Sequence, residues 1–121
     1  MERDQIARKY HRNGYNCAQA VYAAFADSAQ ITMEKALEDA RFWGGGAKVK
    51  CGAVYAAEQI IAACADTQKD MMIEAFEKEF VLENEDLECR RLLGTGRKRG
   101  KSCNDYVGDA AAALQHVLSE K

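Results

Sequence analysis

Hydrophobic positions recur every three or four residues along most of the chain, which is the spacing of helices that bury one face. No segment shows the sustained alternation of apolar and polar residues that marks a half-buried strand. Proline, which interrupts helices, is absent from the 121 residues. The pattern predicts helices over 3–12, from 16, over 32–42, over 51–65, from 66, from 84 and from 102. We therefore expect an all-α fold, a compact bundle of six or seven short helices in a single domain over residues 1–121.

The helix expected over 51–65 differs from the others in being dominated by alanine. Its only large aliphatic side chains are Val54, Ile60 and Ile61. Small residues on most faces allow neighbouring helices to approach closely. This segment is therefore expected to be the central helix of the bundle.

Two of the predicted helices begin with the pattern of a capping box. Asn16 is followed three residues later by Gln19, and Ser102 is followed by Asp105. In this arrangement each side chain bonds the backbone N–H group of the other residue at the start of a helix. The residue after each cap, a cysteine in both cases, is expected in the first helical turn.

Composition and charge narrow the class of protein. Apolar residues make up 48% and charged residues 30%, the balance of a globular domain. The net charge of -2 argues against general binding of nucleic acids or membrane surfaces. No apolar run approaches the roughly 20 residues that span a bilayer, so membrane insertion is not expected. Residues 1–5 lack the layout of a signal peptide, which predicts a cytoplasmic protein.

In a reducing compartment, the five cysteines are more often catalytic, redox-active or metal-binding than structural. Cys17, Cys51 and Cys103 each fall at the start of a predicted helix. The unsatisfied N–H groups and the positive dipole end there favour a thiolate over a thiol. Cys89 is followed by two arginines, whose positive charges also favour a thiolate over a thiol. Four cysteines therefore have a local reason to react or to ligate a metal.

Cys64 does not fit this set. It lies thirteen residues along the same predicted helix as Cys51, about 20 Å away by the helical rise, so the two cannot share a metal. A buried, small hydrophobic role is the simpler interpretation. No C-x-x-C spacing is present, so neither a thioredoxin-type pair nor a zinc ribbon is indicated. Convergence of the other four depends on tertiary packing, and ordinary packed cysteines are an alternative of equal weight.

A run of glycines precedes Cys51. Three consecutive glycines, 44–46, are costly to order, which points to unusual backbone angles or to a close approach of another group. Gly45, Gly46 and Gly52 are therefore candidate cofactor-binding positions. Lysines at 48 and 50 flank the cysteine and favour its thiolate. Trp43 either shields this site from water or belongs to the core.

Three further features have simple explanations besides functional ones. The basic loop 97–101 either binds an anionic ligand or partner, or balances the acidic residues before it. Glu58 lies two turns beyond Cys51 on the same helical face and is a possible acid–base group, although an exposed glutamate is the simpler interpretation. His11 and His116 are expected at the surface.

The order of these elements resembles a known family. The resemblance is carried by Cys17, by the glycine-rich approach to Cys51-Gly52-Ala53, by Cys89 before Leu92-Leu93-Gly94, and by Cys103 ahead of a terminal helix. This arrangement, from about Tyr15 to Leu118, is similar to that of the redox-active C_GCAxxG_C_C proteins. The chain departs from the motif at Ala56, where the family has glycine. The resemblance implies that the four characteristic cysteines are Cys17, Cys51, Cys89 and Cys103, and it implies redox activity without naming a substrate.

Two functions follow as hypotheses. In the first, the four cysteines converge, either for thiol–disulfide exchange or to bind an iron–sulfur cluster or zinc through Cys17, Cys51, Cys89 and Cys103. An enzyme of this kind would be a thiol-based or metal-dependent oxidoreductase with a redox partner protein. In exchange chemistry we expect Cys51 as the attacking thiolate and Cys17 or Cys103 as its resolving partner. In the second hypothesis the chain is a non-catalytic helical module that binds a ligand or partner through its basic loop. A homodimer is compatible with either function.

Overall fold

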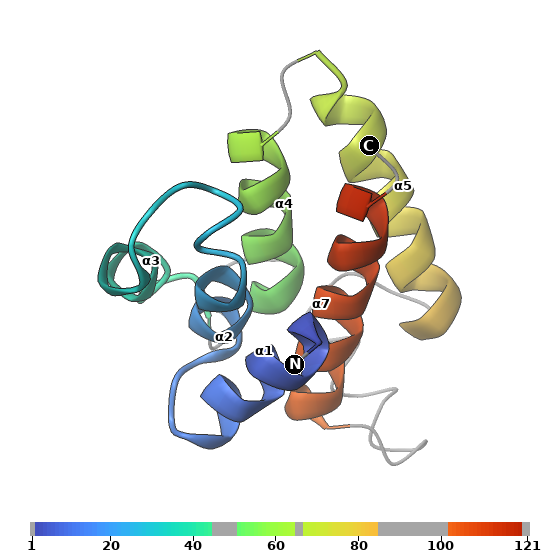
Figure 1. Cartoon of the computed structure of the whole chain (residues 1–121). Coiled ribbons are helices and arrows are strands. Elements are labelled where there is room, and N and C mark those ends of the chain that lie inside the picture. The colour runs from blue at the N-terminus through green and yellow to red at the C-terminus, as the bar shows by residue number, and fades with distance from the viewer. Residues whose placement is uncertain (1, 45–50, 65–66, 85–101, 120–121) are drawn as a thin grey trace.

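The chain folds into helices in every part that the computed structural model describes, residues 2–44, 51–64, 67–84 and 102–119. Within these ranges there are six helices and no strand, which confirms the predicted all-α fold. The helices are α1 (Arg3–Arg12), α2 (Cys17–Ala24), α3 (Met33–Asp39), α4 (Gly52–Cys64), α5 (Lys69–Asn84) and α7 (Cys103–Ser119) (Figure 1).

The alanine-rich helix α4 was expected at the centre of the bundle, but α2 and α7 have more helix neighbours. Helix α4 packs against α2, α5 and α7, whereas α2 and α7 each pack against four of the described helices. Ala53, Ala56 and Ala57 are completely buried on α4, so the backbones of its neighbours come close. Figure 1 shows α4 (green) and α7 (orange to red) running in the same direction, so both helices begin at the same end of the bundle. Helix α5 runs in the opposite direction beside α7.

Helix α1 packs on both α2 and α7. The side chain of Asn104, in the first turn of α7, donates to the carbonyl oxygen of Arg8 at 3.2 Å. The Arg8 guanidinium forms ion pairs with Asp105 at 3.4 Å and Asp109 at 3.9 Å. It lies against Gly108, where a Cβ would collide with the guanidinium. The first turns of α7 are therefore fixed to α1.

The start of α2 is fixed to the end of α3. The predicted capping box of Asn16 and Gln19 is present. The amide groups of the same two residues also donate to the carbonyl oxygens of Arg41 at 2.9 Å and Leu37 at 2.8 Å. Such carbonyls lack partners within their own helix. Helix α3 ends at Asp39, three residues before the predicted end, and these side chains bind the backbone at and beyond that end.

Helix α5 extends to the residue from which a further helix is predicted. Asn84 is the last residue of α5, fully buried, and its amide donates to the Phe80 carbonyl at 3.3 Å. The helix expected after it lies outside the described residues, as does the basic loop 97–101. None of the described helices is long and apolar enough to cross a membrane.

Candidate thiol site

The three family cysteines that lie within the described residues occupy helix starts, as predicted. Cys17 is the first residue of α2, and Cys103 is the first residue of α7. Cys51 directly precedes α4, and its carbonyl oxygen accepts the first helical bond, from Tyr55, at 2.9 Å. Cys89 lies outside the described residues, as do Gly45, Gly46 and the lysines at 48 and 50.

Cys17 and Cys51 form a contacting pair of thiols. The side chains of Cys51 and Cys17 are hydrogen-bonded to each other, and a Cβ on Gly52, next to Cys51, would lie 2.6 Å from the Cys17 sulfur. The sulfur of Cys51 in turn accepts from the backbone N–H groups of Ala53 and Val54, so this side chain caps α4. Cys51 is 4% exposed and Cys17 6% exposed. The pair is therefore enclosed where α2 meets α4.

The pKa of Cys51 lies well above its ordinary value. The main cause is the hydrogen bond that its side chain makes with Cys17, followed by burial and by the negative charge that Cys17 carries when ionised. The N–H groups of Ala53 and Val54 act in the opposite direction but are outweighed. The helix start exerts the thiolate-favouring effect expected from the sequence, yet burial and the second thiol reverse the net result.

Gly52 explains how the two sulfurs come together. A Cβ at this position would lie 2.6 Å from the Cys17 sulfur, 3.0 Å from the Gly44 Cα and 3.1 Å from the Trp43 carbonyl oxygen. Two of these atoms are backbone and cannot rotate away. The structure therefore places Gly52, a candidate cofactor-binding position, in direct packing against Cys17 and the 43–44 backbone.

An aromatic cluster lies beside this contact. The Trp43 ring packs edge-on against Tyr22 on α2, with centroids 4.9 Å apart, and against Tyr55 on α4, at 5.2 Å. Burial is the largest cause that raises the pKa of Tyr22, which keeps its hydroxyl protonated. Trp43 is half-buried and packs on the core. The two tyrosines were not recognised from the sequence, because they come from different helices and share no spacing.

Cys103 is the third member of the site. It lies near Cys17. Unlike the contacting pair, it is only half-buried at the edge of the core. Its neighbour Asn104 bonds α1 at Arg8, and its side-chain amide also lies 3.1 Å from Nδ1 of His11. The predicted capping box is present, with Asp105 accepting from the Ser102 N–H at 2.7 Å.

Cys64 stands apart from these three thiols, as its spacing predicts. Its thiol donates to the Ser28 carbonyl oxygen at 3.1 Å, and the residue is half-buried rather than fully buried. Glu58 was expected to be exposed, which is wrong: only 9% of it is exposed. The difference arises because α4 is surrounded by α2, α5 and α7. His116 is exposed and bonds Glu79 at 2.8 Å.

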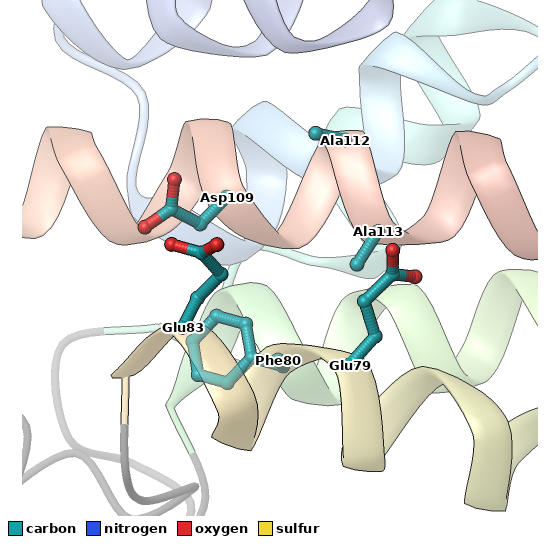
Figure 2. Close-up of a pocket in the computed structure, with 6 residues that line it drawn as sticks. All are labelled: Glu79, Phe80, Glu83, Asp109, Ala112 and Ala113. Atoms are coloured by element: carbon teal, nitrogen blue, oxygen red, sulfur yellow. The ribbon is translucent and has the colours of Figure 1, made fainter.

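A pocket of about 300 Å³ lies between α5 and α7, and it contains no cysteine among its lining residues. Figure 2 shows the carboxylates of Glu83 and Asp109 facing each other, with Phe80 beneath Glu83 and Glu79 farther along α5. Ala112 and Ala113 complete the lining from α7. The acidic pocket is therefore separate from the thiol site.

The described part of the chain does not bring together a set of metal ligands. Over residues 2–44, 51–64, 67–84 and 102–119, no three His, Cys, Asp or Glu side chains form a group that could hold a metal ion. Zinc and iron–sulfur sites draw three or four ligands from the protein. The contacting pair supplies two sulfurs, so any metal would need Cys89 or a shift of Cys103. The four described cysteines are not joined in disulfides.

Comparison with protein families gives a match over most of the chain. The family described as "Putative redox-active protein (C_GCAxxG_C_C)" matches residues 15–117. The chain therefore belongs to the C_GCAxxG_C_C family. A search of curated proteins gave no match, and a search of solved structures gave none either.

Gly52→Ala tests the close approach at the thiol pair. The added Cβ collides with Cys17 and with two backbone atoms, and this outweighs the better helix propensity of alanine. We expect the free energy of unfolding to fall by about 1–3 kcal/mol in urea titrations. Ala62→Ser, at an exposed position on the same helix, should change it by less than about 0.5 kcal/mol. If both substitutions lower the free energy of unfolding by the same small amount, Gly52 is not packed against Cys17 and the 43–44 backbone.

The raised pKa of Cys51 predicts a specific pH dependence of stability. Above about pH 8.5, an unfolded thiol loses its proton while the folded Cys51 keeps it, so stability falls as the pH rises. The slope is up to about 1.4 kcal/mol per pH unit for one proton. Urea titrations of the reduced protein from pH 7 to pH 10 should show this loss in the wild type and in Ala62→Ser. Cys51→Ser should lack it, and parallel curves for all three proteins would show that the pKa of Cys51 is not raised.

Proposed function

We propose that Cys17 and Cys51 form a reversible dithiol–disulfide couple that exchanges with disulfides outside the protein. One observation carries the proposal: two buried thiols from different helices are hydrogen-bonded to each other. Membership of a redox-active cysteine family supports the same class of chemistry. An enzyme with this couple would be a thiol-based oxidoreductase.

The reaction converts two thiols into one disulfide. An external disulfide gains two electrons and two protons and becomes two thiols, while the sulfurs of Cys17 and Cys51 lose the same number and become bonded. Each step is an attack by a thiolate on a sulfur, and the departing sulfur takes up a proton. No further oxidant is required.

The two thiols are electrostatically coupled, so they lose protons as a pair and not as separate groups. Either sulfur can therefore carry the first negative charge and attack. The order expected from the local sequence, in which Cys51 attacks and Cys17 or Cys103 resolves, stays a prediction.

A metal centre is the alternative use of the same cysteines. An iron–sulfur cluster or zinc would be bound through Cys17, Cys51, Cys89 and Cys103. We favour the dithiol because two sulfurs in contact already suffice for a disulfide, whereas the described residues lack a third ligand in place. A metal, if bound, would hold the thiolates in place and tune their charge.

Oxidation of the purified protein tests the proposal. We expect glutathione disulfide to convert the reduced protein into a form with two fewer titratable thiols. Peptide mapping by mass spectrometry should assign the new disulfide to Cys17 and Cys51. Cys17→Ser and Cys51→Ser should each abolish that disulfide, because either substitution removes one of the two sulfurs. Cys64→Ser is the matched control, since its thiol bonds Ser28 instead of the pair, and it should oxidise normally.

Two outcomes would contradict the dithiol couple. One is that Cys17 and Cys51 remain reduced while other cysteines pair. The other is that anaerobically purified protein contains stoichiometric iron or zinc that is lost on substitution of any of the four family cysteines. The second outcome would support the metal alternative.

A further inference from the structure

The sulfurs of Cys17 and Cys51 are too buried to react directly with an external disulfide. Cys17 and Cys51 are 6% and 4% exposed. Thiol–disulfide exchange requires the attacking sulfur to approach one sulfur of the incoming disulfide, opposite the sulfur that leaves. A disulfide carried by a peptide or by glutathione is too bulky to reach a sulfur so enclosed. Exchange with the interior pair therefore needs a more exposed thiol beside it.

We infer that Cys103 is the thiol that meets external disulfides and relays the disulfide bond inward to Cys17 and then to Cys51. This inference rests on the proposed dithiol couple and extends it. Cys103 is half-buried and lies near Cys17, so it is both more accessible than the pair and close to it. The substrate class is a disulfide in a small molecule or at the surface of a peptide.

The backbone that carries Cys103 is held in place, so a turn of its side chain is the movement that brings its sulfur to Cys17 in the relay. Cys103 begins α7, whose capping box orders the first turn. Asn104 and Asp105 tie that turn to α1 through the Arg8 carbonyl and guanidinium. Helix α1 also packs on α2, which carries Cys17. The relative placement of the two helix starts that carry Cys103 and Cys17 is therefore set by three packed helices.

The relay balances in sulfur, electrons and protons. Cys103 attacks the external disulfide and forms a mixed disulfide, and the first external thiol leaves with a proton. Cys17 then attacks the Cys103 sulfur, and the second external thiol leaves. Finally Cys51 attacks the Cys17 sulfur and releases Cys103 as a thiol. The net change is one external disulfide reduced to two thiols and one Cys17–Cys51 disulfide formed.

Cys64 provides a matched control for this role. It is also half-buried, but it lies at the far end of α4 from Cys51, about 20 Å along the helix. Its thiol bonds the Ser28 carbonyl oxygen. A general effect of removing a partly exposed thiol would therefore appear in both Cys64→Ser and Cys103→Ser. Only the relay predicts a difference between them.

The test measures the rate and the equilibrium of oxidation separately. With glutathione disulfide, Cys103→Ser should form the Cys17–Cys51 disulfide at least tenfold more slowly than the wild type and Cys64→Ser. The midpoint potential of the pair should be the same in all three proteins, because a relay changes access and not the final bond. A disulfide-linked peptide is the second probe, and the probe with the larger rate loss identifies the substrate source. Wild-type rates for Cys103→Ser with both probes, or a shifted potential, would overturn the relay.

A trapping experiment gives an independent readout. In Cys17→Ser the relay stops after its first step, so mass mapping should find the glutathione adduct on Cys103. An adduct that forms first on Cys51, Cys64 or Cys89 would overturn the assignment. Failure of the wild type to form the Cys17–Cys51 disulfide at all would instead reject the dithiol couple. The two proposals therefore fail in distinguishable ways.

Discussion

The close approach of the start of α4 to the start of α2 is the constraint on which the thiol site depends. It requires a residue without a side chain at Gly52, since the space for a Cβ is filled by the Cys17 sulfur, the Gly44 Cα and the Trp43 carbonyl. The alanines that follow continue the close packing along α4. On the other side, Asn16 and Gln19 fix the start of α2 to the end of α3. The two sulfurs meet because both helix starts are held in this way.

The environment of the pair sets two electrostatic effects against each other. A helix start stabilises a nearby negative charge by typically 0.3–1 kcal/mol, or about 2 kcal/mol in favourable geometry. Burial disfavours a charged form by up to several pKa units, each about 1.4 kcal/mol. At Cys51 burial and the hydrogen bond to Cys17 prevail, so its pKa is raised. The N–H groups at the start of α4 then serve mainly to hold the sulfur in position.

Local sequence predicts the features that local forces determine. The structure confirms the helical spacing, the two capping boxes and the placement of cysteines at helix starts. Each of these features depends on residues within a few positions of each other. The burial of Glu58 and the net shift of the Cys51 pKa depend on which helices surround α4. The contact between Cys17 and Cys51 joins residues 34 positions apart, and no spacing rule encodes it. Helix-start positions and the resemblance to a family grouped these two cysteines with Cys103, but neither predicted which of them would be in contact.

Crystal structures of the reduced and the oxidised protein test the central claim most directly. The account predicts a Cys17–Cys51 sulfur separation of about 2.05 Å after oxidation, the length of a disulfide bond. In the reduced protein the same two sulfurs should lie in hydrogen-bonding contact, with Gly52 packed on Cys17. Cα atoms of Cys17 and Cys51 more than about 7 Å apart in both states would contradict the account, because a disulfide cannot bridge that distance.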